Sequence, residues 1–130
     1  MNLTHDGLTL WFGTPDTPGP FDEEVVAREG VSLLVGVHPA NPTNSIVVRY
    51  RVDSGIMQSV PGREVRTDHV RGRQYFVASF PSFVTGNVVE YWPLLSCGGR
   101  QVPAASQMDR FRGHFRLEPK RVGSRSNRTT

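Results

Sequence analysis

The chain has 130 residues, which is enough for one hydrophobic core and too short for two independent ones. Its 13 glycines and 10 prolines favour short elements over long helices, and its net charge of +3 combines a mildly acidic body with a basic C-terminal end. The single cysteine, Cys97, excludes an internal disulfide and a multi-cysteine zinc site, and no apolar run approaches the ~20 residues that span a bilayer.

Short strand-like segments begin near the N-terminus. Residues 8–12 alternate apolar and polar side chains and predict a first strand, which a long proline-rich loop over 13–20 then ends. Residues 25–27 fit either a short edge strand or one helical turn. Residues 31–37 are rich in β-branched side chains and predict a strand that ends at a proline- and asparagine-rich connection.

The clearest alternation lies in residues 46–52. Successive side chains of a strand point to opposite faces, so the apolar set, Ile46, Val48, Tyr50 and Val52, is expected to face the core. A tight turn at residues 53–55 leads into residues 57–61, and the two segments predict a hairpin.

The second half of the chain continues the pattern. Residues 64–68 are polar and could form a short edge strand, whereas residues 74–80 and 88–95 are apolar and predict two core strands. A Gly-Gly turn then leads to a partner strand over residues 100–103. Residues 109–117, in which Phe and Arg alternate imperfectly, could form a final strand or lie as an arm across a neighbouring molecule.

Together these segments predict an all-β antiparallel sandwich of about seven or eight strands over residues 1–117. Residues 118–130 are predicted to form a basic, flexible tail. A basic arm begins at Arg110, inside the predicted sandwich, and continues into the tail. It contains one acid, Glu118, and seven basic residues: Arg110, Arg112, Arg116, Lys120, Arg121, Arg125 and Arg128.

Four runs between about residues 45 and 103 carry a family resemblance. They are VVRYRVDSG at residues 47–55, YFVASFP at 75–81, GNVVEY at 86–91 and CGG at 97–99. This pattern resembles bacterial immunoglobulin-like and fibronectin type III-like modules. The resemblance implies a sandwich fold and no particular activity, because this architecture carries many functions. The family's disulfide does not carry over, since the chain has one cysteine.

A candidate contact surface lies on the predicted strand over residues 88–95. If Glu90 marks its outer face, Trp92 lies there too, and Arg49 and Arg51 on another strand could lie nearby. An exposed tryptophan flanked by Arg and Glu is suited to bind a sugar or a protein partner. Alternatively, Trp92 packs under the tail or a loop. Trp11 is expected to fill the core.

No enzymatic motif is present in the sequence. The four histidines lie in no catalytic or metal-ligating spacing, and there is no nucleophile elbow, glycine-rich phosphate loop or paired-carboxylate pattern. We therefore expect no catalysis, no cofactor and no metal.

Three functions remain open. The leading hypothesis is a non-enzymatic protein-interaction or assembly module, either cytoplasmic or part of an assembled particle, with the basic arm able to dock on an acidic patch at residues 22–24 of a second copy. The first alternative is a carbohydrate-binding module that uses Trp92. The second is nucleic-acid binding through the arm, whose basic and aromatic residues could neutralise phosphates and stack on bases.

Overall fold

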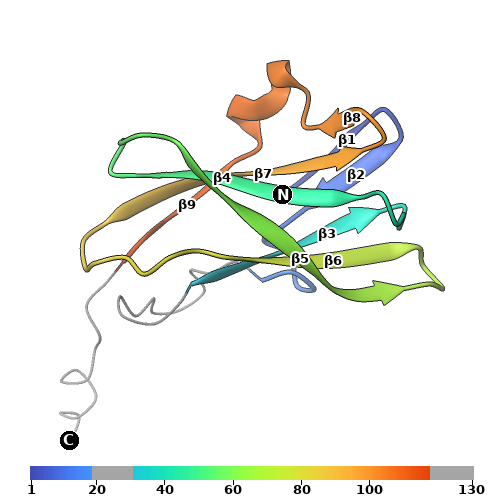
Figure 1. Ribbon diagram of the computed structural model, residues 1–130, viewed down its shortest axis with the longest axis horizontal. Helices are drawn as coiled ribbons and strands as arrows, with labels where there is room; N and C mark the ends of the chain where they lie inside the picture. Colours follow the sequence, from blue (N-terminus) through green and yellow to red (C-terminus); the bar gives the residue numbers. More distant parts are fainter. Residues whose placement is uncertain (19–30, 118–130) are drawn as a thin grey trace, which may run out of the picture.

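The computed structural model describes residues 1–18 and 31–117. Nine strands and one short helix form within these residues (Figure 1). They are, in chain order, β1 (Asn2–His5), β2 (Leu8–Trp11), β3 (Ser32–His38), β4 (Ser45–Val52), β5 (Gln58–Asp68), β6 (Arg73–Ser79), β7 (Val88–Cys97), β8 (Arg100–Val102), the 3-10 helix η1 (Ala105–Arg110) and β9 (Gly113–Arg116).

All pairings between the strands are antiparallel, and the strand order is β1-β2-β3-β6-β5-β4-β7-β8, with β9 also paired to β7. The sheet curls so that β1 and β2, at one end of this order, contact β8 at the other. Two layers result, one built on β2, β3 and β6 and the other on β4 and β7. The prediction of an all-β antiparallel fold is confirmed, and the strands form a curled antiparallel sheet with which a sandwich-like class is compatible.

Strand β5 connects the two layers. Its first residues, up to Pro61, pair with β4, and its residues from Gly62 onward pair with β6, with a register shift between Glu64 and Arg66. Figure 1 shows β5 running across the molecule from β4 to β6. The sequence predicted two separate segments here, because proline and glycine usually interrupt a strand. Gly62 instead allows a close approach, since a Cβ there would lie 2.7 Å from Cβ of Ile46.

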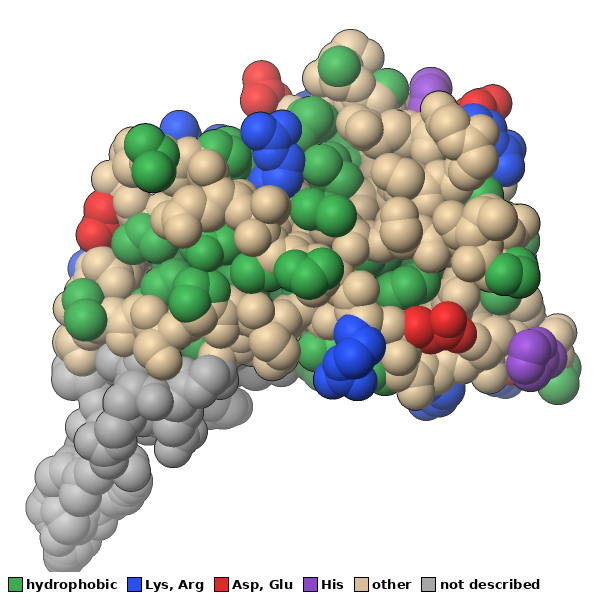
Figure 2. All heavy atoms as spheres, in the orientation of Figure 1, with side chains coloured by type: hydrophobic (Ala, Val, Ile, Leu, Met, Phe, Trp, Pro, Cys, Tyr) green, Lys and Arg blue, Asp and Glu red, His purple; other side chains and the backbone are tan. Residues whose placement is uncertain are grey.

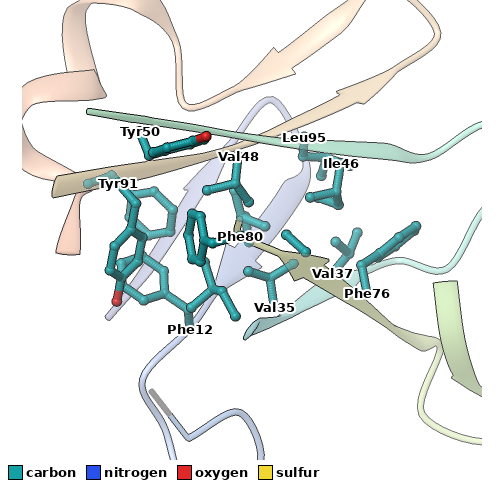
Figure 3. Close-up of a cluster of buried hydrophobic side chains, with 14 of the residues drawn as sticks. Phe12, Val35, Val37, Ile46, Val48, Tyr50, Phe76, Phe80, Tyr91 and Leu95 are labelled. Atoms are coloured by element: carbon teal, nitrogen blue, oxygen red, sulfur yellow. The ribbon is translucent and has the colours of Figure 1, made fainter. Parts of the chain in front are cut away.

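The core fills the space between the layers (Figure 3). As predicted, Ile46, Val48 and Tyr50 of β4 point inward and are buried. Tyr91 packs its ring 5.9 Å from Phe115 and 6.1 Å from Phe80, measured between ring centroids. Such tilted aromatic contacts add about 0.5–1.5 kcal/mol each to the burial of the rings themselves.

The C-terminal segment of the described chain belongs to this core. Phe111 and Phe115 are each 2% exposed, and β9 pairs with β7 along its whole length. Residues 109–117 therefore supply a final strand, one of the two predicted possibilities. The segment at residues 25–27 and the tail over 118–130 lie outside the described residues, and the domain boundary at residue 117 stays a prediction.

Two elements were not predicted from the sequence. Strand β1 is polar and mostly exposed, and η1 buries none of its residues, so neither carries the apolar periodicity that identifies an element. Within residues 1–18 and 31–117, no helix is long and apolar enough to cross a membrane.

Candidate functional site

A pocket of about 470 Å³ opens on the outer face of the layer that contains β2, β3 and β6. Most of its lining side chains are polar, and one is a tryptophan. The lining residues are Asn2, Thr9, Trp11, Thr14, Pro15, Asp16, His38 and Arg73. They come from β1, β2, the loop after β2, the end of β3 and the start of β6, so the fold brings together residues from both sides of the undescribed segment.

The alternation of β2 places Trp11 in this pocket. Leu8 and Leu10 point into the core, so Thr9 and Trp11 point outward. Trp11 lies opposite Gly36 of β3, and a Cβ at Gly36 would lie only 2.2 Å from Cε2 of the indole. The missing side chain lets the ring cover the backbone of β3. Trp11 is buried, as predicted, with 9% of the residue exposed, but it lies outside the main core cluster, on the opposite face of the sheet.

Tyr75 of β6 extends the row of aromatic side chains. It lies opposite Gly36 on the other side of β3, and its ring meets that of Trp11 edge to face, with 6.1 Å between centroids. Two arginines stack on the rings: the guanidinium of Arg66 lies 4.3 Å from the Tyr75 centroid, and that of Arg73 lies 5.8 Å from the Trp11 centroid. These cation–π contacts hold both aromatic side chains in place.

Asp16 fixes the polar side of the pocket. Its Oδ1 accepts hydrogen bonds from the indole Nε1 of Trp11, at 3.3 Å, and from the Thr14 hydroxyl, while its Oδ2 accepts one from the Tyr75 hydroxyl at 2.9 Å. Partial burial favours the neutral acid, but these hydrogen bonds favour the carboxylate more strongly, and the pKa of Asp16 is lowered.

The loop after β2 presents Asp16 to these partners. Thr14 and Thr17 form an isolated β-bridge, and the amide of Gly13 donates to the Thr17 carbonyl at 2.8 Å. Thr17 is fully buried, so the turn is anchored at its base while Asp16 projects toward the pocket.

The arrangement is suited to binding. It combines an aromatic surface with fixed hydrogen-bonding groups in a concave site, which is the usual composition of a ligand pocket. Within the described residues, no group of three or more His, Cys, Asp or Glu side chains is placed to hold a metal ion.

The surface predicted around Trp92 is assembled differently. Arg51 Nε lies 2.6 Å from Glu90 Oε1 and its guanidinium lies 5.6 Å from the Trp92 ring, while Arg49 lies opposite Trp92 in the sheet. The four residues are therefore neighbours on the outer face, as the alternation predicted. Trp92, however, is only 6% exposed, in agreement with the packed alternative. Their role as a contact surface stays a prediction.

Glu90 is engaged from two sides. The hydrogen bond from Arg51 lowers the pKa of Glu90, and Arg112 Nη1 adds a second ion pair at 3.4 Å from Oε2. Glu90, which was predicted to flank Trp92 at a contact surface, forms ion pairs with two arginines of the protein. The charged groups at this surface are thus largely paired with each other.

The basic arm is only partly described. Arg110 lies in η1, Arg112 contacts Glu90, and Arg116 lies exposed on β9. The remaining basic residues of the arm, Lys120, Arg121, Arg125 and Arg128, lie outside the described residues. Phe111 and Phe115 are buried, so they cannot stack on bases as the nucleic-acid hypothesis required. Figure 2 shows basic and acidic side chains interspersed over the described part of one face rather than gathered in a basic stripe.

Comparison with known proteins identifies relatives by fold only. No protein-family model matches the chain, and no curated protein sequence does. Two solved structures from Listeria monocytogenes share the fold, each over 83% of this chain with a TM-score of 0.62. One, the uncharacterized protein lmo2446 in complex with α-D-glucose, β-D-glucose, magnesium and calcium, is 15% identical; the other, a cycloalternan-forming enzyme in complex with a pentasaccharide substrate, is 16% identical. The matched region spans 10% of each of those chains.

A third structure, of BhCBM56, matches 88% of this chain and 97% of its own at 16% identity, with a TM-score of 0.45. The leading functional prediction, a protein-interaction or assembly module, is wrong: the two Listeria structures that share the fold are bound to glucose and to a pentasaccharide substrate.

Proposed function

We propose that this domain binds carbohydrate, without catalysing a reaction, in the pocket beside Trp11. The observation that carries the proposal is the tryptophan held on the outer face of the sheet, inside a concavity lined by polar side chains. The C–H face of a pyranose ring packs on an indole, and its hydroxyls need hydrogen-bonding partners at the rim. Asn2 and Arg73 line the pocket together with Trp11 and supply such partners.

The comparisons support this proposal through the fold. The Listeria structures are bound to glucose and to a pentasaccharide, and the fold they share with this chain is compatible with a sugar ligand. The choice of the pocket rests on the residues of this chain. Trp92, the tryptophan predicted from the sequence, lies beside the guanidinium of Arg51 and is not among the residues that line the pocket beside Trp11.

We also propose the immunoglobulin or fibronectin type III form of the sandwich. The order β2-β3-β6-β5 in one layer and β4-β7-β9 in the other, with the start of β5 also paired to β4, supports it, because such modules have a four-stranded and a three-stranded sheet.

The test is binding to a panel of polysaccharides and oligosaccharides, followed by titration calorimetry on the best ligand. We expect Trp11→Ala to weaken binding at least tenfold, a loss of about 1.4 kcal/mol or more. Trp92→Phe is the matched control and should bind as the wild type does. Asn2→Ala removes an exposed lining side chain with little risk to folding, and we expect a smaller loss from it.

Two results would contradict the proposal. One is a correctly folded wild-type protein that retains no member of the panel. The other is a loss of binding in Trp92→Ala with unchanged binding in Asn2→Ala and Trp11→Ala, which would move the site to the surface that carries Arg51 and Glu90. Circular dichroism of each variant separates lost binding from lost folding.

A further inference from the structure

The acceptor capacity of the pocket is largely used within the protein. Asp16 is the only acid among the lining residues, and an ionised carboxylate offers about four acceptor sites. Three of them already receive the Trp11 indole, the Thr14 hydroxyl and the Tyr75 hydroxyl. A neutral sugar presents many hydroxyl donors, and Asp16 has little capacity left to accept them.

The threonine hydroxyls of the pocket are occupied in the same way. Thr9 Oγ1 lies 2.9 Å from Thr4 Oγ1, and Thr14 Oγ1 lies 2.8 Å from Thr17 Oγ1 in addition to its bond to Asp16. Besides Asp16 and the hydroxyls, the remaining polar side chains that line the pocket are Asn2, His38 and Arg73.

Arg73 supplies donors in excess. Its guanidinium carries five N–H groups, and none of them donates a hydrogen bond to an acceptor within residues 1–18 and 31–117. The nearest acid is Asp16, whose Oδ2 lies 4.0 Å from Nη1, at the limit of an ion pair. The Arg73 side chain is 44% exposed, so a ligand can reach it.

Building on the carbohydrate-binding function proposed above, we propose that the pocket selects acidic saccharides and that Arg73 binds their carboxylate. An anion accepts hydrogen bonds without donating any, which fits a pocket in which the guanidinium of Arg73 has unused donors and the acid, Asp16, is already engaged by three donors of the protein. The planar guanidinium matches a carboxylate through two parallel hydrogen bonds. Because Arg73 stacks beside Trp11, one uronic acid residue could contact both side chains.

The experiment uses matched pairs of polysaccharides on the full chain. Polygalacturonate, alginate, hyaluronan and xanthan are each compared with their carboxyl-reduced forms, in which a neutral hydroxymethyl group replaces the carboxylate of the uronic acid. We expect the acidic member of at least one pair to bind about tenfold more tightly, and the difference to shrink as sodium chloride is raised from 50 to 500 mM. Dextran sulfate against dextran tests whether any polyanion suffices.

Variants assign the effect to Arg73. We expect Arg73→Gln to abolish the preference for the acidic form and Arg73→Lys to retain part of it. Arg63→Gln is the control, because it removes the same charge from an exposed residue that does not line the pocket. Equal binding of acidic and reduced forms would overturn this inference and leave the proposed function standing. Binding of no glycan would overturn both. If Arg63→Gln and Arg73→Gln weakened binding to the acidic polysaccharide equally, and the wild type also bound dextran sulfate, the preference would reflect unspecific charge attraction and the inference would be overturned.

Discussion

Asp16 connects the two aromatic residues of the pocket at the level of single side chains. Its carboxylate accepts from Trp11 and Tyr75, which come from strands on opposite sides of β3, and the sequence separates Asp16 from Tyr75 by 59 positions. One carboxylate therefore fixes the orientation of both rings. The same group links the ligand pocket to the stability of the fold.

This role predicts that the contribution of Asp16 to the stability of the fold depends on pH. Folding lowers its pKa, so the ionised form stabilises the folded state above the ordinary value of 3.8, and that stabilisation disappears as the pH falls below it. We expect Asp16→Asn to lower the free energy of unfolding by about 1 kcal/mol at pH 7, a value reduced by solvent screening since the side chain is 38% exposed.

Urea denaturation at pH 7, 5 and 3 provides the measurement for Asp16. The free energy of unfolding should be higher for the wild type than for Asp16→Asn at pH 7 and 5, and this difference should be smaller at pH 3. A gap of constant size would mean that the carboxylate contributes nothing through its charge. Asp53→Asn is not a suitable control, because Asp53 also accepts hydrogen bonds from Asn87 and Val88; Asp109, exposed on η1, is a better one.

Tyr91 gives a second prediction at this scale. Its side chain is fully buried, burial raises the pKa of its hydroxyl, and no partner for that hydroxyl lies within residues 1–18 and 31–117. A buried polar group without a hydrogen bond costs about 1–3 kcal/mol. We expect Tyr91→Phe to leave the thermal midpoint unchanged or to raise it, as measured by calorimetry. A clear drop in the midpoint would reveal a partner for the hydroxyl.

The sequence contained a signal for the pocket that was missed. Leu8 and Leu10 define the inner face of their strand, and the same alternation that was used to assign Glu90 and Trp92 places Trp11 outward with Thr9. The partner, Gly36, is a single small residue in an apolar run, and nothing in one sequence says that it lies under Trp11. The long-range contacts that make Asp16 an acceptor are set by strand order, which alternation does not encode.

Among the elements, the last described strand, β9, belongs to the packed core. β9 pairs with β7 and buries Phe115, whose ring lies 5.9 Å from those of Phe80 and Tyr91. Leu117 is fully buried, and its amide donates to the Asn87 carbonyl at 2.9 Å. These contacts make residues 111–117 part of the packed core.

A truncation series tests this boundary. We expect a chain that ends at residue 117 to fold with the stability of the full chain, and one that ends at residue 110 to be unfolded. Phe115→Ala should lose about 3–5 kcal/mol of unfolding free energy, whereas Arg116→Ala, exposed on the same strand, should change it by less than about 0.5 kcal/mol. Similar effects of the two substitutions would contradict a structural role for β9.

Most of the strands that were predicted correctly have one face buried. β2, β3, β4, β6 and β7 each carry apolar side chains at the positions that reach the core, and alternation is sufficient to find them, whereas β8 was predicted from the Gly-Gly turn before it. β5 is different, because it changes partner at Pro61 and Gly62 and buries few side chains on either face. Its continuity depends on the two layers that it joins, which a local pattern does not describe.

At the scale of the whole molecule, β5 makes the two layers one unit. The same strand pairs with β4 in one layer and with β6 in the other, and a single cluster of buried side chains lies between them. The ends of the sheet also meet: Arg100 Nη1 donates to the Asp6 carbonyl at 3.1 Å, between the β7–β8 and β1–β2 turns. Neither layer can lose its packing without exposing the inner face of the other.

We therefore expect unfolding in one cooperative step that both tryptophans report. Trp11 lies in the layer of β2, β3 and β6, and Trp92 lies in the layer of β4 and β7, so Trp92→Phe and Trp11→Phe each leave a probe in one layer. In each variant, the urea transitions followed by tryptophan fluorescence and by far-ultraviolet circular dichroism should coincide, as two-state unfolding requires. In Trp92→Phe, Trp11 is the remaining tryptophan. If its fluorescence transition fell at a lower urea concentration than the circular dichroism transition, the pocket layer would unfold independently, and β5 would not couple the layers.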